Sequence, residues 1–301
     1  MTIQRRDFIK STGLALGAAS VSKINFLNFL FEQDAFKMTA LRNNVGIFEE
    51  RGGTIAWMVS NNGIVVVDTQ FPEQAGHLIG EIKKKSTRHI DLLINTHHHG
   101  DHSAGNIAFK GLVKNHMAHE NAVKNMKANG ERNNSMDKVL LPENDFKKKF
   151  STKVGGEKVS MNYFGPGHTD GDAIIHFENT NIAHMGDLLF NRRVPFIDKS
   201  AGANIENWQV VLEEAQKHYD NDTLFVYGHA GEGYEIQGGK SDLAAFQNYL
   251  GKVLEFVKKG VAAGKTKEEL AKTESIPGAE AFKGDQTRSV NAAWTEIVDG
   301  K

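Results

Sequence analysis

The stretch Thr96-His97-His98-His99-Gly100-Asp101-His102 decides how this sequence is interpreted. It places imidazoles and a carboxylate at the spacing His-x-His-x-Asp-His, directly after an apolar run at residues 90–94. A short, continuous apolar run is typical of a buried strand, so we expect the cluster on a loop at the end of that strand, where rigid scaffolds present chemistry. With 13 His among 301 residues, chance rarely produces this spacing. We interpret it as a metal-binding motif rather than as a solvated loop or a cloning tag.

Three later positions share one local pattern, in which a metal-capable side chain follows a glycine near the end of a strand-like run. These positions are His168, Asp187 and His229. Glycine tolerates the backbone angles of a sharp turn, so each strand can turn its last side chain toward a common centre. Taken alone, each residue is more often structural. Taken together with the first motif, they indicate one shared metal site.

In this order, between residues 44 and 230, the motifs resemble those of the metallo-β-lactamase superfamily. Asp68, which ends the apolar run 65–67, matches a strand-end aspartate that braces the metal loop in that family. The resemblance implies an α/β protein, a four-layer αβ/βα sandwich with the metals at one edge. The apolar pattern agrees: it predicts strands at 44–48, 54–59 and 64–68 with a tight turn at 60–63, and then alternating strands and helices.

The resemblance also implies a ligand set. One metal is expected on His97, His99 and His168, a second on Asp101, His102 and His229, and Asp187 is expected to bridge both. Imidazole and carboxylate ligands without thiolates suit zinc, so we expect two zinc ions per chain. The same ligands also suit iron or manganese.

This ligand set implies a dinuclear zinc-dependent hydrolase. A metal-bridging hydroxide is the expected nucleophile, and Asp101 is the expected catalytic residue, which orients the hydroxide and passes a proton to the leaving group. An ester, thioester, amide or lactam bond of a small molecule is the expected substrate. The chain has no cysteine, which excludes thiol catalysis and the lactamases that hold a metal through cysteine. Asp187 resembles instead the glyoxalase-II-like and general hydrolase branches.

The sequence is also compatible with other functions. A mononuclear-iron sulfur dioxygenase of the same fold resembles this chain at His97, His99, His168 and Asp187, although the second group of ligands is then redundant. A β-lactamase proper and a non-catalytic metal-binding or partner-binding member are further alternatives. The metal content, the consumption of oxygen and the turnover of substrate distinguish these alternatives.

Substrate contacts are only weakly indicated. Arg192 and Arg193 follow Asp187 closely and could hold a substrate carboxylate through paired hydrogen bonds, but a solvated pair that merely positions the chain explains them equally well. The polar segment 130–153 is expected to form a loop or hairpin that borders the site.

The first 36 residues differ from the rest of the chain. Twin arginines, Arg5 and Arg6, precede Phe8, Lys10 and a weakly apolar run at 12–21, a pattern typical of a twin-arginine export signal. We therefore expect a signal peptide and linker at 1–36, a catalytic domain at 37–301, and a periplasmic or otherwise exported protein. The apolar run is too short to span a membrane. An amphipathic amino-terminal helix is the alternative.

The net charge of the chain and the helical periodicity after His229 give two further predictions. Lys and Arg total 36 against 37 Asp and Glu, so nothing favours binding to nucleic acid. After His229 the sequence predicts helices, one that starts near 241, a short one with a capping box at 266–269, and a last one over 285–298. We expect these helices to complete an outer layer. The sequence gives no indication of the oligomeric state.

Overall fold

The computed structural model describes residues 36–300. The chain separates into two compact units, Met1–Lys37 and Met38–Lys301. The expected export signal lies outside the described residues. The account below concerns the second unit, which carries all of the predicted metal ligands.

The first sheet contains seven strands in their sequence order. They are β1 (Lys37–Arg42), β2 (Val45–Glu49), β3 (Ile55–Ser60), β4 (Gly63–Val67), β5 (Leu92–Ile94), β6 (His116–His119) and β7 (Asn144–Phe146). Strands β2, β3 and β4 pair antiparallel, whereas β4 to β7 pair parallel. The three predicted strands and the tight turn between the last two are thus present as β2, β3 and β4.

The second sheet contains six strands in the order β15-β13-β11-β10-β9-β8. They are β8 (Lys149–Val154), β9 (Glu157–Asn162), β10 (Ile174–Phe177), β11 (Ile182–His184), β13 (Leu224–Val226) and β15 (Gln237–Gly238). Only the pair β11 and β13 is parallel among these neighbours. A separate two-stranded ladder joins β12 (Phe190–Asn191) to β14 (His229–Ala230).

A hydrophobic core joins the two sheets. Val65 and Ile94 of the first sheet belong to the same buried cluster as Met161, Ile175 and Val226 of the second. Alternate residues of β4 and β5 are buried on the other face as well, which is usual when crossover helices cover a parallel sheet. The sheets therefore form the two inner layers of the fold.

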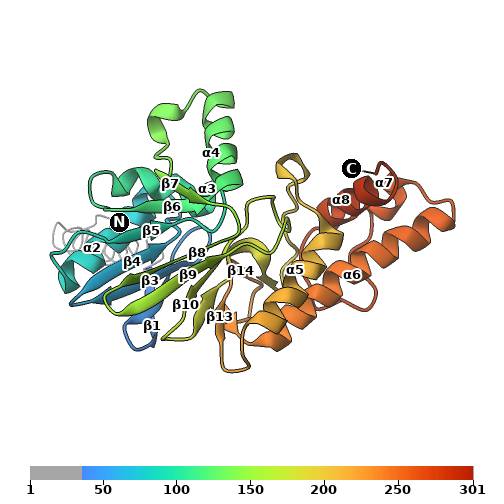
Figure 1. Cartoon of the computed structure of the whole chain (residues 1–301). Coiled ribbons are helices and arrows are strands. Elements are labelled where there is room, and N and C mark those ends of the chain that lie inside the picture. The colour runs from blue at the N-terminus through green and yellow to red at the C-terminus, as the bar shows by residue number, and fades with distance from the viewer. Residues whose placement is uncertain (1–35, 301) are drawn as a thin grey trace, which may run out of the picture. The chain divides into compact units, whose positions relative to one another are not determined.

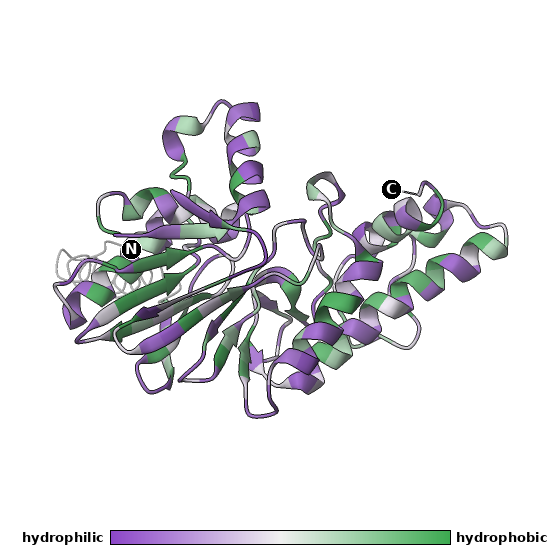
Figure 2. Cartoon of the chain, viewed as in Figure 1, coloured by the Kyte–Doolittle hydropathy of each residue, from purple (hydrophilic) through white to green (hydrophobic). Residues whose placement is uncertain are grey.

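Helices form the two outer layers (Figure 1). On one side α2 (Pro72–Lys85), α3 (Gly100–Ser103) and α4 (Glu120–Arg132) follow the parallel strands of the first sheet. On the other side α5 (Ile205–His218) and α6 (Lys240–Ala262) cover the second sheet, α8 (Thr287–Ile297) packs on α6, and α7 (Lys267–Leu270) contacts α8. Apolar stripes of α5 and α6 alternate with polar faces (Figure 2). Trp208 and Phe246 on those stripes share a core with Phe225 of β13. The predicted four-layer sandwich is confirmed.

The carboxyl-terminal helices also agree with the sequence. Helix α6 begins at Lys240, and α8 spans Thr287–Ile297. Helix α7 opens with the predicted capping box, in which Thr266 and Glu269 bond each other's backbone. Their apolar faces continue the core of the outer layer.

The prediction for segment 130–153 is wrong in part. Residues 144–146 and most of β8 form edge strands of the two sheets rather than a loop or hairpin beside the metal ligands. Edge strands commonly carry charged side chains that discourage pairing with other chains. Most of β8 is solvent-exposed, so its sequence lacks the apolar pattern of a buried strand.

Candidate metal centre

The predicted ligands all stand just beyond strand ends. Strand β5 leads into the first motif, whose last residues form α3. Asp187 lies in a short 3₁₀ turn, Gly186–Leu188, after β11, and His229 opens β14 after β13. His168 occupies the loop between β9 and β10. Four loops from two sheets thus meet at one edge of the sandwich.

The structure brings the seven predicted ligands into two adjacent groups. Within each group one ligand atom of every residue lies within 4.8 Å of the others. The groups are His97, His99, His168 and Asp187, and Asp101, His102 and His229. Residues almost 130 positions apart in the sequence therefore present nitrogen and oxygen atoms to the same small volume.

Unpaired polar atoms mark the centre of this volume. Among the described residues, the buried atoms without a hydrogen-bond partner include His97 Nε2, His102 Nε2 and Asp187 Oδ1. A buried polar atom that lacks a partner is costly. Cations held by the two groups would satisfy these three atoms, so the donor set fits bound metal.

The carboxylate of Asp187 faces both groups. Its Oδ2 lies 3.3 Å from His168 Nε2 and 3.9 Å from His97 Nε2. Its Oδ1 lies 3.0 Å from His102 Nε2 and 3.4 Å from His229 Nε2. Each oxygen is therefore directed at one group, which is the arrangement that a bridging ligand requires.

Burial and neighbouring charges set the protonation of the site. Burial alone would raise the pKa of Asp187, but the imidazoles of His229 and His102 outweigh it and hold that pKa well below its usual range. Burial lowers the pKa of His168 to about 3 and that of His97 well below its ordinary value. These two imidazoles are thus neutral at physiological pH, the form that binds metals.

Asp68 holds the first motif in place. Its carboxylate is buried and accepts hydrogen bonds from the Thr96 backbone N–H at 2.8 Å, from the Thr96 hydroxyl at 2.7 Å and from His102 Nδ1 at 2.7 Å. Its backbone adopts a φ of 66°, a left-handed conformation that aspartate tolerates better than most residues. The side chain of Asp68 therefore fixes the loop and orients His102 Nε2 toward the space between the two groups of ligands. This bracing role is the one predicted for Asp68.

Two further braces were not predicted. His99 Nε2 bonds Asp198 Oδ2 at 2.9 Å, and His168 Nδ1 bonds the backbone oxygen of Phe196 at 2.8 Å. Asp198 belongs to an irregular segment and follows neither a strand nor a glycine, so the rule that found the ligands could not find it. Asp198 also forms a possible cation-binding group with His98 and His99. Since its carboxylate already bonds His99, we assign it a bracing role.

Two glycines give the ligands room. A Cβ at Gly228 would collide with Asp187 Oδ1, and a Cβ at Gly53 would collide with the His102 ring. Gly228 belongs to the predicted pattern of a glycine before a ligand. Gly53 lies far from every ligand in the sequence, so only the folded chain shows that its lack of a side chain matters.

A cavity of about 650 Å³ opens onto the ligands. His99, Asp101, Asp187 and His229 line one side of it. The side chains of Asp101 and His229 are 31% and 12% exposed, whereas those of His97 and His168 are buried. A substrate in the cavity therefore meets Asp101 and His229 of the second group, and His99, which is 15% exposed, of the first.

The two predicted arginines have different surroundings. Arg192 Nη1 lies 3.3 Å from the Asp242 carboxylate, and its guanidinium lies over the ring of Phe282. Arg193 is exposed and lines the cavity. Arg193 alone of this pair is thus placed to meet a substrate in the cavity, and no residue of segment 130–153 lines it.

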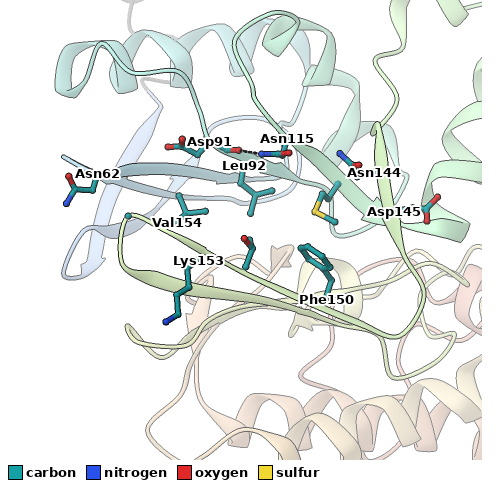
Figure 3. A pocket seen from close by; sticks show the side chains of 12 residues that line it. Asn62, Asp91, Leu92, Asn115, Asn144, Asp145, Phe150, Lys153 and Val154 are labelled. Carbon is teal, nitrogen blue, oxygen red and sulfur yellow. Dashed lines mark hydrogen bonds between the residues drawn. The ribbon is translucent and has the colours of Figure 1, made fainter.

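A second cavity, of about 480 Å³, lies at the opposite ends of the parallel strands (Figure 3). Asp91, Asn115 and Asn144 stand at or just before the first residues of β5, β6 and β7, and Phe150 and Lys153 come from β8. No histidine lines this cavity. The two groups of metal-capable side chains therefore lie at the other, carboxyl ends of these strands.

The fold and the donor set define a metal-dependent enzyme of the αβ/βα sandwich class. Residues 50–229 match the metallo-beta-lactamase superfamily, and the chain belongs to that family of metal-dependent hydrolases. The metallo-beta-lactamase IND-1 of Chryseobacterium indologenes is 24% identical over 74% of this chain and 90% of its own length. A type 2 metallo-beta-lactamase of Bacillus cereus is 26% identical over 66% of this chain and 78% of its own length.

Solved structures show the same fold. A metallo-beta-lactamase from Pontibacter korlensis superposes with a TM-score of 0.60 at 18% identity, over 72% of this chain and 99% of that one. A variant of the sec-alkyl sulfatase PisA1 superposes with a TM-score of 0.67 at 13% identity, over 87% of this chain. This chain spans only 50% of that sulfatase chain. The predicted fold and enzyme class are confirmed.

Proposed function

We propose that the protein is a dinuclear zinc hydrolase that cleaves an ester, thioester, amide or lactam bond in a small molecule. The observation that carries the proposal is the orientation of Asp187, whose two oxygens face two separate groups of ligands. The unpaired nitrogens of His97 and His102, one in each group, support it.

The residues that would hold the metals follow from the two groups. His97, His99 and His168 would hold one zinc, Asp101, His102 and His229 would hold the other, and Asp187 would contact both. Imidazole and carboxylate donors without thiolates match zinc chemistry. When bound, such a pair of ions supplies a water of lowered pKa as nucleophile and polarises the bond to be cleaved.

Asp101 is the residue proposed to move the proton. Its carboxylate is partly exposed to the cavity and lies 3.1 Å from His229 Nε2. Burial would raise the pKa of Asp101, but the hydrogen bond with His229 and the charge of His102 lower it overall. Asp101 is therefore a carboxylate at neutral pH, able to take a proton from the nucleophile and return it to the leaving group.

The complete second group favours the hydrolase over a mononuclear-iron sulfur dioxygenase. In such an enzyme Asp101, His102 and His229 would have no role, although these residues converge as closely as the first group. Lactams are natural candidates among substrates because several relatives are named metallo-beta-lactamases. The likeness to the sulfatase concerns the fold alone.

Elemental analysis of the purified mature protein tests the proposal. We expect about two zinc ions per chain, and a chelator should abolish turnover of a panel of lactams, thioesters and esters until zinc is restored. One iron ion per chain together with oxygen consumption would establish the dioxygenase instead. Stable metal binding without turnover of any substrate would favour a non-catalytic member.

We also propose that residues 1–36 are a twin-arginine signal and that residues 37–301 form the exported catalytic domain. The basis is the sequence pattern around Arg5 and Arg6. Among the described residues, no helix is long and apolar enough to cross a membrane. Replacing both arginines by lysine should keep the protein in the cytoplasm of a bacterial host, whereas unchanged export would exclude this route.

A further inference from the structure

A short carboxyl-terminal segment, residues 283–288, forms one wall of the catalytic cavity. Lys283, Asp285 and Arg288 line the same cavity as His99 and Asp187. The family match ends at residue 229. This wall therefore comes from a part of the chain beyond the residues that the family model matches.

Backbone hydrogen bonds attach the segment to the loop after the bridging aspartate. The Val194 N–H donates to the Lys283 oxygen at 3.0 Å, and the Lys283 N–H donates to the Arg192 oxygen at 3.2 Å. Arg193 and Lys283 form an isolated parallel bridge. The side chains of Arg193 and Lys283 are thus carried by one rigid pair of backbones at the edge of the cavity.

The cations of this wall form no close ion pair among the described residues, although the charge of Arg288 interacts with Asp285 and that of Lys283 with Glu280. Among residues 36–300, no ion pair within 4.0 Å joins Arg193, Lys283 or Arg288 to a carboxylate, whereas Arg192 pairs with Asp242 and Lys199 pairs with Glu296. Asp285 is the acidic residue of the wall, and it accepts a hydrogen bond from the Thr287 backbone N–H. A concave surface with excess positive charge attracts anions.

Arg288 occupies a place that helix stability does not explain. It stands in the first turn of α8, where a cation is unfavourable for the helix, and Asp285, which precedes the helix, offsets its charge only in part. Its guanidinium lies 5.2 Å from the centre of the Phe196 ring, which is 42% exposed. The Phe196 ring centre lies 5.4 Å from that of His99. One phenyl ring thus separates the guanidinium from a metal ligand.

We propose that Arg288 and Lys283, assisted by Arg193, bind an oxyanion group of the substrate. The substrate is then an anion with an apolar part that packs on Phe196. The charged group of the substrate lies about one ring width from the bond that is cleaved. Arg288 suits this role because a planar guanidinium can donate two parallel hydrogen bonds to a carboxylate or a sulfonate. The inference rests on the proposed hydrolase function and narrows its substrate class.

A matched pair of substrates tests the proposal in the zinc-loaded full chain. p-Nitrophenyl acetate is neutral, and mono-p-nitrophenyl glutarate carries a remote carboxylate. Arg288→Ala should lower kcat/KM for the glutarate by about 10- to 100-fold, mainly through KM, since a hydrogen bond to a charged group is lost. Turnover of the acetate should change by less than about twofold. Arg288→Lys should recover part of the loss, because it restores charge without the planar fork.

Two further variants separate a specific contact from a general effect of charge. Lys283→Ala should weaken turnover of the glutarate alone, by less than Arg288→Ala. Lys258→Ala removes an exposed lysine of α6 that does not line the cavity and should change neither substrate. Equal effects of Arg288→Ala on both substrates, or equal effects of Lys258→Ala and Lys283→Ala, would overturn the proposal.

Binding measurements keep this test separate from that of the hydrolase function. Titration calorimetry with benzoate and with benzenesulfonate on metal-free protein should show binding that weakens about 10-fold or more in Arg288→Ala. The tighter of the two probes identifies a carboxylate or a sulfonate-like group. If binding to the metal-free protein depended on Arg288 while the zinc-loaded protein hydrolysed no substrate of the panel, the anion site would be supported and the hydrolase function refuted. If the zinc-loaded protein hydrolysed the substrates and neither hydrolysis nor anion binding depended on Arg288, the hydrolase function would be supported and the anion site refuted.

Discussion

The two groups of ligands differ in how firmly the protein holds them. Each imidazole of the first group has a partner behind it: the Thr96 hydroxyl for His97, Asp198 for His99, and the Phe196 backbone oxygen for His168. In the second group, among the described residues, only His102 has such a partner, Asp68. We name them the braced group (His97, His99, His168) and the open group (Asp101, His102, His229).

This difference between the two groups lets one site bind metal tightly and still admit a substrate. Braces orient ligands and raise metal affinity, and the groups that brace His97 and His168 also help to bury these two rings. His97 and His168 of the braced group are buried and His99 is 15% exposed, whereas in the open group His102 is buried and Asp101 and His229 are 31% and 12% exposed. We therefore expect the braced group to bind its metal first and the open group to meet the substrate.

The largest expected effect comes from removing one ligand of each group. His97→Ala should lose the tightly held zinc, whereas His229→Ala should retain about one zinc per chain, because its braced group is intact. Zinc per chain after gel filtration in metal-free buffer measures both. His89→Ala, which removes an exposed histidine before β5, should keep about two zinc ions. Equal losses in the two site variants would refute the distinction between the groups.

The next effect concerns catalysis in the open group. Asp101→Ala should lower kcat by about 10²- to 10⁴-fold, because the proton acceptor is lost, while the fold remains intact. Turnover of the best substrate and the thermal midpoint of unfolding measure the two quantities. A variant that turns over a confirmed substrate at the wild-type rate would eliminate Asp101 from the mechanism.

A smaller effect is expected from the braces themselves. Asp68→Asn should weaken zinc binding by about 10- to 100-fold in the open group, and Asp198→Asn should weaken it in the braced group. Competition with a chromogenic chelator resolves the two binding steps. If Asp198→Asn affected the weaker step and Asp68→Asn the tighter one, our assignment of braces to groups would be reversed.

The smallest expected effect is a difference in pH dependence. Burial lowers the pKa of His97 and His168, so protons compete little with metal in the braced group. Burial would also lower the pKa of His102, but Asp187 and Asp68 raise it well above its ordinary value, so His102 must release a proton when it binds metal. As the pH falls, the open group should lose zinc first. Zinc content measured from pH 8 to pH 5 should fall in two steps, and a single step would contradict this order.

The fold and the convergence of the metal-capable side chains could be predicted because their signals are local. An apolar run followed by glycine and a metal-capable side chain identifies a strand end at His168, Asp187 and His229 without knowledge of any other segment. The edge strand β8 escaped prediction for the same reason, since its exposed side chains give no apolar pattern. A local rule succeeds where the residue's own neighbours determine its role.

The surroundings of the ligands could not be predicted in this way. Nothing near Asp198 in the sequence indicates that it meets His99, and nothing distinguishes Arg192, which pairs with Asp242, from Arg193, which faces the cavity. Each of these roles depends on the direction of one side chain in an irregular segment. That direction is set by packing against distant parts of the chain.

The family, the α/β class and the metal-capable side chains could be identified from the sequence, because strand periodicity, glycine turns and ligand spacing each involve a few neighbouring residues. The folded chain was needed to show that Asp187 faces two groups, that one group is braced and the other open, and that Lys283 and Arg288 reach the cavity. These features arise where segments that are far apart in the chain pack together, and their geometry exists only once the sheets and helices have assembled.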